Sequence, residues 1–169
     1  MNNTYFELIG KMKRSVSIPS DEVAQFIENY VFFENTHITN DKYLKVVSNG
    51  KVEMFLFYNN SNLVITNGKN EITLTNFIVG IFELENALYI KPVTKSAYLS
   101  GIFITFNFRG VCQYFGLPVK AFTNKIVRLE TIFGDRSKTL IDKITNASCN
   151  KQREKILNEF FLEELKTTI

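Results

Sequence analysis

The sequence predicts an α+β fold: a mainly antiparallel β barrel or sandwich, preceded by an N-terminal helix, with C-terminal helices packed on it. Between about residues 43 and 108, apolar side chains recur at every second position, the period of half-buried strands. On both sides of this region the spacing becomes that of amphipathic helices. Turn dipeptides such as Asn49-Gly50 and Asn67-Gly68 separate strand candidates, as expected for antiparallel hairpins.

The chain is predicted to form one domain, residues 1–169, with a β body at about 32–108 and a helical part at about 109–166. A chain of 169 residues can bury about 70% of the surface that it exposes when unfolded. Sixteen phenylalanines and a hydrophobic content of 45% can supply its core.

The N-terminal helix is predicted from a capping signal and an apolar stripe. Ser20 is a good N-cap, and Asp21 and Glu22 favour a first helical turn. The stripe has the spacing of about three helical turns and comprises Val23, Phe26, Ile27 and Tyr30. The aromatic run that begins at Tyr30 then indicates a passage into a strand.

Short strand candidates follow, each bounded by turn-forming residues. They are predicted at Tyr43–Val47, Val52–Tyr58, Asn62–Thr66, Glu71–Leu74, Phe77–Phe82, Ala87–Lys91 and Tyr98–Phe108. Strands of this length and spacing favour an antiparallel barrel or sandwich.

Helices are predicted for the remainder of the chain. The break at Arg109-Gly110 is followed by a short helix, Val111–Phe115, which Gly116 closes. A second helix, with Asp135 as its cap, carries the apolar residues Leu140, Ile141, Ile144 and Ala147. A last amphipathic helix, from Asn150 to Lys166, carries the apolar stripe Ile156, Leu157, Phe160, Phe161 and Leu165.

The residues that usually carry metal or nucleophilic chemistry are scarce. His37 is the only histidine, whereas a metal site of a small β-barrel enzyme needs two or three histidines and a carboxylate. A Ser-His-Asp scheme would have to use His37, but its polar surroundings indicate an exposed loop. We therefore predict no catalytic residues, no bound metal and no cofactor.

Three other candidates for chemistry are weaker than their structural interpretations. Cys112 near a helix start could form a reactive thiolate, but a buried cysteine that packs as a small hydrophobe is favoured. Glu83 and Glu85 could act as acid and base, but they are typical of a solvated strand end. Arg109-Gly110 lacks the several glycines of a phosphate-binding loop, so the turn is interpreted as structural.

Charge and composition favour a cytoplasmic protein without a membrane segment. The net charge of +3 is close to balanced, and the densest basic cluster, Lys11, Lys13 and Arg14, is too short to indicate a DNA-binding surface. No run approaches the roughly 18 apolar residues of a membrane helix, and the N-terminus lacks the order of a secretory signal. Cys112 and Cys149 are unpatterned, which suits a reducing compartment.

Several stretches, taken together, resemble the N-terminal regulatory domain of AraC-type bacterial transcription regulators. The stretches that carry the resemblance are Phe26–Glu34, Asn49–Phe57, Phe77–Gly80, Phe106–Pro118 and Leu129–Gly134. The order and spacing of these motifs match the family from about Ile18 to Leu165. Two residues depart from it: Phe108 stands where proline is usual, and Arg109 where glycine is frequent.

The resemblance implies a cupin-like body that binds a small-molecule effector, a homodimer, and control of DNA through a C-terminal helix-turn-helix domain absent from this chain. For the dimer surface it points to the last helix, through Ile156, Leu157, Phe160, Phe161 and Leu165. An equally weighted alternative is that this stripe packs on the chain's own β body.

The ligand-facing side of the β body is left open by the sequence, because either face of each strand could line the interior. Phe55 and Phe57 share one face of their strand, and Phe103, Thr105 and Asn107 share one face of another strand. These residues are the candidates for orienting a ligand. The more ordinary interpretation is that Thr105 and Asn107 face water. Alternative functions are a small barrel enzyme or isomerase acting on a sugar or other metabolite, and a stand-alone ligand-binding or protein-interaction module.

Overall fold

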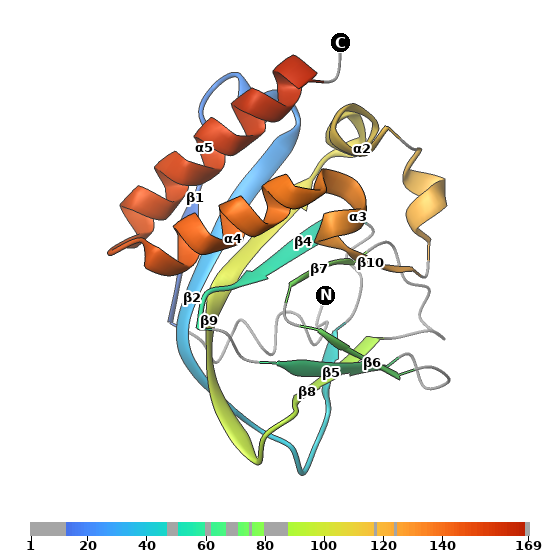
Figure 1. The fold of residues 1–169 in the computed structure, drawn as a ribbon, viewed down its shortest axis with the longest axis vertical. Coiled ribbons are helices and arrows are strands. Elements are labelled where there is room, and N and C mark those ends of the chain that lie inside the picture. Colours follow the sequence, from blue (N-terminus) through green and yellow to red (C-terminus); the bar gives the residue numbers. More distant parts are fainter. Residues whose placement is uncertain are drawn as a thin grey trace.

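The computed structural model describes residues 13–46, 51–59, 62–66, 71–74, 76–79, 88–116, 118–123 and 125–167. The fold is α+β, with antiparallel strands in two sheets and several helices (Figure 1). The six-stranded sheet has the order β1-β2-β9-β4-β7-β10, and the four-stranded sheet the order β3-β8-β5-β6. The described strands thus form two separate sheets and no closed barrel.

The strands of the large sheet come from distant parts of the chain. They are β1 (Lys13–Ser17), β2 (Ile27–Thr39), β4 (Val52–Phe57), β7 (Phe77–Val79), β9 (Ser96–Phe106) and β10 (Ile126–Arg128). The small sheet contains β3 (Leu44–Val46), β5 (Leu63–Thr66), β6 (Glu71–Leu74) and β8 (Leu88–Pro92). All the predicted strands are therefore present with small shifts in their bounds, whereas β1, β2 and β10 were not predicted as such. Asn49-Gly50, Asn67-Gly68, Lys11, Glu83 and Glu85 lie outside the described residues.

The predicted N-terminal helix is wrong. A single 3-10 turn, Val23–Gln25, precedes β2, which begins at Ile27 and pairs with both β1 and β9. The apolar residues at the end of the predicted stripe lie in this strand and not in a helix. The reason is that the aromatic and β-branched residues from Tyr30 to Phe33 fit a sheet that is covered on both faces.

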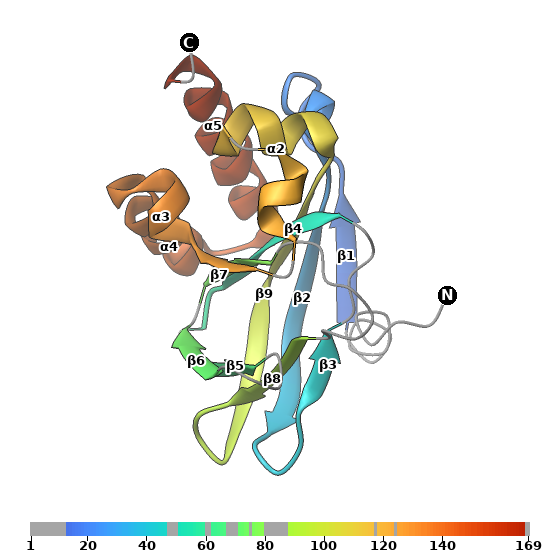
Figure 2. The same cartoon turned by 90° about the vertical axis from the view of Figure 1, so that its right-hand side faces the viewer.

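The helices cover one face of the six-stranded sheet and gather at one end of the molecule, with the four-stranded sheet at the other end (Figure 2). They are α2 (Phe108–Phe115), α3 (Leu129–Phe133), α4 (Asp135–Asn146) and α5 (Asn150–Thr167), with a 3-10 helix at Val119–Phe122. Asp135 is the first residue of α4 and not its cap, since the N-cap is Gly134. None of the helices in the described ranges combines the length and apolar character needed to cross a membrane.

Each central strand contributes to two cores through its alternating side chains. Met54 and Ile104 face the helices and pack in one cluster with Leu157 and Phe161 of α5. The residues on the opposite face, including Phe55 and Phe103, pack in a second cluster against the four-stranded sheet. Strands β2, β4 and β9 are therefore shared by the two halves of the molecule.

The turn from β9 into α2 is a side-chain-capped helix start. Asn107 is the N-cap, and its side-chain Oδ1 accepts a hydrogen bond from the Gly110 backbone N–H at 2.9 Å. Gly116 closes the helix in the left-handed conformation, with φ of 66°. Gly110 lies against the backbone of Phe26, where an added Cβ would stand 2.0 Å from the carbonyl oxygen.

A Gly110→Ala variant is expected to lose about 2 kcal/mol of folding free energy, because steric overlap with a backbone carbonyl outweighs the gain in helix propensity of about 1 kcal/mol. Chemical denaturation of the two proteins measures this difference. Alanine at Cys112, an exposed position in the same helix, is the control and is expected to change stability little. A Gly110→Ala protein as stable as the wild type would show that the backbone moves aside at no cost.

Candidate functional site

The face of the large sheet that looks toward the small sheet is the candidate ligand site. Cross-strand pairing of β2, β9 and β4 places its side chains in three rows. The rows are Phe33–Gly101–Phe57, Val31–Phe103–Phe55 and Asn29–Thr105–Glu53. The first two rows are apolar and the third is polar, so we call them the aromatic rows and the polar row.

The aromatic rows form a packed wall. The Phe33 and Phe103 rings stack with centroids 4.7 Å apart, and Phe55 meets Phe103 edge-on at 4.5 Å. Gly101 makes room for this packing, since a Cβ there would lie 2.9 Å from the Phe33 ring and 2.4 Å from the Leu56 carbonyl oxygen. The wall is completed by Leu63, Ile65 and Ile90 of the small sheet.

The polar row is buried at the edge of this wall. Glu53 is 5% exposed and Thr105 is 4% exposed. The side-chain Oδ1 of Asn29 is buried and has no hydrogen-bond partner among the described residues. A carboxylate is rarely buried this deeply, because removing its charge from water is costly. Together these three side chains give this face of the sheet a polar end beside the apolar wall.

The structure gathers four of the five predicted ligand residues, Phe55, Phe57, Phe103 and Thr105, on this face. The interpretation that Thr105 faces water is wrong, since its side chain is buried. Asn107 lies apart from them and caps α2, while its Nδ2 donates to the Gln25 carbonyl oxygen at 2.9 Å.

Glu53 is the residue that sequence reasoning missed. The signal was available, because Glu53 has the same parity as Phe55 and Phe57 and must share their face in a strand. A charged residue in phase with buried aromatics on one strand is expected to be buried with them.

Two of the residues considered for chemistry lie in places that the sequence did not indicate. His37 belongs to strand β2 and not to a loop, and its exposed ring lies 4.9 Å from that of Tyr98. Cys112 is exposed, so its interpretation as a buried hydrophobe is wrong. Within the part of the chain that the structure describes, no group of three or more histidine, cysteine, aspartate or glutamate side chains could hold a metal ion.

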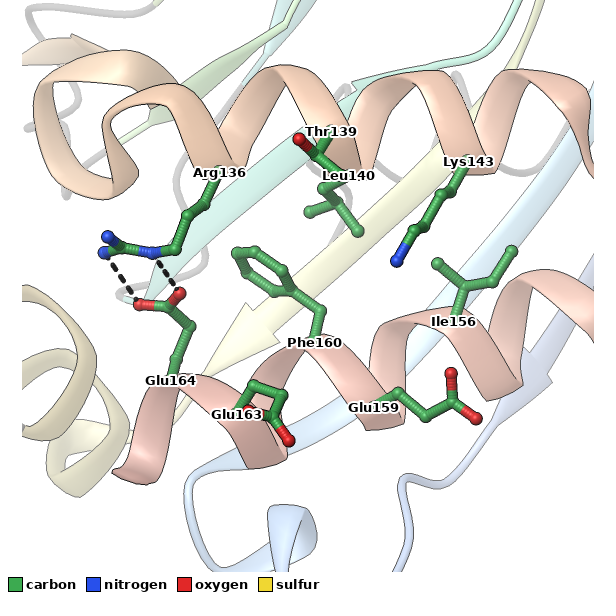
Figure 3. Close-up of a pocket in the computed structure, with 9 residues that line it drawn as sticks. All are labelled: Arg136, Thr139, Leu140, Lys143, Ile156, Glu159, Phe160, Glu163 and Glu164. Atoms are coloured by element: carbon green, nitrogen blue, oxygen red, sulfur yellow. Dashed lines mark hydrogen bonds and ion pairs between the residues drawn. The ribbon is translucent and has the colours of Figure 1, made fainter. Parts of the chain in front are cut away.

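The stripe on α5 divides between two environments. Leu157 and Phe161 are fully buried against the sheet, which is the alternative of packing on the chain's own β body. Ile156, Phe160 and Leu165 are half-buried. Of these, Ile156 and Phe160 line a groove of about 370 Å³ between α4 and α5 (Figure 3). Only this second part of the stripe is open to a partner.

Two buried tyrosines pack beneath α5, Tyr30 of β2 and Tyr114 of α2. The Tyr30 hydroxyl donates a hydrogen bond to Asn158 Oδ1 at 2.9 Å. Burial raises the pKa of Tyr30 and of Tyr114 well above that of a free tyrosine. Tyr30 thereby ties β2 to α5, whereas the buried hydroxyl of Tyr114 has no hydrogen-bond partner among the described residues.

In comparisons with known proteins, no family model matches the chain and no curated protein sequence is similar to it at a significant level.

Proposed function

We propose that this chain is a sensing and dimerisation domain of an AraC-type transcription regulator, with a cupin-like body that is open in the form described above. A small-molecule effector would bind between the sheets and alter DNA binding by a helix-turn-helix domain outside this chain. In this proposal the protein is not an enzyme, needs no cofactor or metal, and meets DNA only through that other domain.

The observation that carries the proposal is the sharing of strands β2, β4 and β9 by both halves of the molecule. On one face these strands carry the aromatic rows and the polar row, and on the other they pack against α2 and α5. A ligand that pushed the two sheets apart would move strands that are in direct contact with the helices. Because the same strands contact both layers, ligand binding on one face would shift the position of the helices on the other.

The polar row suggests the chemical class of the effector. Glu53 and Thr105 lie next to the apolar wall, and Asn29 offers a buried carbonyl oxygen. A small molecule with an apolar body and a hydroxyl or amine group would satisfy both parts.

A Glu53→Gln variant tests this proposal, because the change removes the charge and keeps the shape. Wild-type protein screened against small apolar alcohols and amines is expected to show ligands that raise its melting temperature by mass action. These ligands should bind Glu53→Gln at least about tenfold more weakly, a loss of about 1.4 kcal/mol for a charged hydrogen bond. Glu130→Gln, an exposed position on α3, is the control and should bind like the wild type.

Hits that bind wild type and Glu53→Gln equally would contradict the placement of the effector. A fusion of the chain to a DNA-binding domain that represses only as a dimer tests the other half of the proposal. Repression that remains at the level of the unfused domain would contradict the dimerisation role.

A further inference from the structure

Strand β1 lies at one edge of the six-stranded sheet, with β2 on its inner side (Figure 2). No strand in the described ranges pairs with its outer side. β1 has five residues, whereas the other edge strands of the two sheets, β10, β3 and β6, have three, three and four. At an open edge, alternate backbone N–H and C=O groups point outward without a partner strand. β1 is therefore the longest open edge among the described strands.

Exposed apolar side chains follow one face of this edge. Val16 is 59% exposed, and Ile18, which directly follows the strand, is 71% exposed. Val16 pairs in register with Val31 of β2, which is only 7% exposed and packs in the cluster between the sheets. On this face the apolar packing therefore covers β2 and stops at β1. A further strand at the edge would extend the apolar face beside Val16 and Ile18.

Charge indicates what kind of strand this edge accepts. Natural edges are commonly closed by bulges or proline, but β1 pairs with β2 without a register shift, and Pro19 comes only after the strand has ended. Arg14 lies on the same face as Val16, is exposed, and forms no ion pair with a residue that the structure describes. β1 contains no acidic residue, so β1 of a second copy would bring no counter-charge to Arg14. The edge therefore favours an acidic partner over a second copy.

We propose that the outer edge of β1 binds an extended segment of another protein by β-strand addition. The partner segment pairs with the outward backbone groups of β1, places alternate apolar side chains beside Val16 and Ile18, and sets a carboxylate opposite Arg14. Backbone hydrogen bonds supply the affinity in this mode of recognition, and the side chains select the sequence. This surface is separate from the inter-sheet face and from the α4–α5 groove, so the result of its test does not depend on effector binding or on dimerisation.

Two capped synthetic peptides that differ in one charge test the proposal. The first has the central order valine, threonine, valine, threonine, glutamate, so that in antiparallel pairing its valines meet Ile18 and Val16 and its glutamate meets Arg14. The second carries lysine in place of the glutamate. Fluorescence anisotropy of the labelled peptides should show saturable binding of the glutamate peptide to the full chain. The lysine peptide should bind about tenfold more weakly, because repulsion replaces attraction at Arg14.

An Arg14→Glu variant is expected to invert this preference and to bind the lysine peptide more tightly than the glutamate peptide. The side chain is exposed, so we expect the variant to fold and to melt like the wild type. Lys138→Glu makes the same change of charge at an exposed position on α4 and is the matched control. It should keep the wild-type preference, because a general effect of net charge would change both variants alike.

Backbone pairing is tested with two methylated forms of the glutamate peptide. Alternate amides of an extended strand point to opposite edges, so N-methyl groups on one set of alternate residues should abolish binding and those on the other set should leave it. Hydrogen exchange should show that amides of β1, and not those of α5, gain protection when the unmethylated peptide is added.

The proposal is overturned if neither peptide binds saturably, if both methylated forms behave alike, or if Arg14→Glu keeps the wild-type preference. Protection gained elsewhere than in β1 would overturn it too. Protection of β1 that rises with protein concentration in the absence of peptide would show that a second copy covers this edge, and would equally contradict an acidic partner.

Discussion

Substitution of Phe161 by glutamate is expected to lower the free energy of unfolding by about 4 kcal/mol or more, enough to unfold much of the protein. The Phe161 side chain is fully buried, with its ring centroid 5.0 Å from that of Tyr114 and 5.7 Å from that of Phe106. A carboxylate at this position would lose these contacts and would be left without water. The free-energy cost of these changes exceeds any gain from contact between the carboxylate and solvent at the helix surface.

Urea denaturation of Phe161→Glu, or failure to obtain folded protein, measures this effect. Phe161→Leu is the matched apolar control and should lose only about 1 kcal/mol, because it keeps most of the buried surface. If Phe161 instead lay on a dimer surface, the glutamate variant would remain folded and become monomeric. A Phe161→Glu protein that is stable and is a monomer in light scattering would therefore contradict the packing described above.

Replacement of Arg153 by alanine is expected to cost about 3 kcal/mol of stability. The guanidinium group donates hydrogen bonds to the Ile144 and Ala147 carbonyl oxygens at 3.1 and 2.9 Å, at the C-terminal end of α4. It also lies 3.8 Å from the centroid of the Tyr58 ring. Without it, the Ala147 carbonyl oxygen loses this donor and the Ile144 carbonyl oxygen keeps only the Ala147 backbone N–H, at 3.3 Å, which is costly at a buried helix end.

The same contacts connect α4 and α5 to the inter-sheet wall. The Tyr58 hydroxyl donates to the Phe33 carbonyl oxygen at 3.3 Å, and Phe33 belongs to the aromatic rows. An Arg153→Ala protein should therefore expose amides of α4 to hydrogen exchange before those of the central strands. Lys151→Ala, an exposed change on the same helix, is the control. Equal stability of Arg153→Ala and Lys151→Ala would show that water replaces the guanidinium without cost.

Several local features were predictable from the sequence because they depend on the chain's nearest neighbours. The left-handed end of α2 needs a residue that tolerates positive φ, and Gly116 stands there. The last helix runs to Thr167, one residue beyond its predicted end at Lys166, because its apolar spacing has a single period throughout. That Phe55 and Phe57 share a face followed from alternation within one strand, whereas their pairing with Phe103 did not.

Other features were decided only by partners that are distant in the sequence. The segment from Val23 to Tyr30 has helical spacing, yet pairing of β2 with β1 and β9 makes its second half a strand, because two neighbours offer more hydrogen bonds and burial than an isolated helix.

Which face of each strand meets the helices, and hence the burial of Glu53 and Thr105, was likewise a matter of tertiary packing. Alternation determines that two faces exist, and only the layers above and below determine what covers each of them. For the same reason the stripe of α5 could be read from sequence, but its division into Leu157 and Phe161 inside and Ile156 and Phe160 at the groove could not.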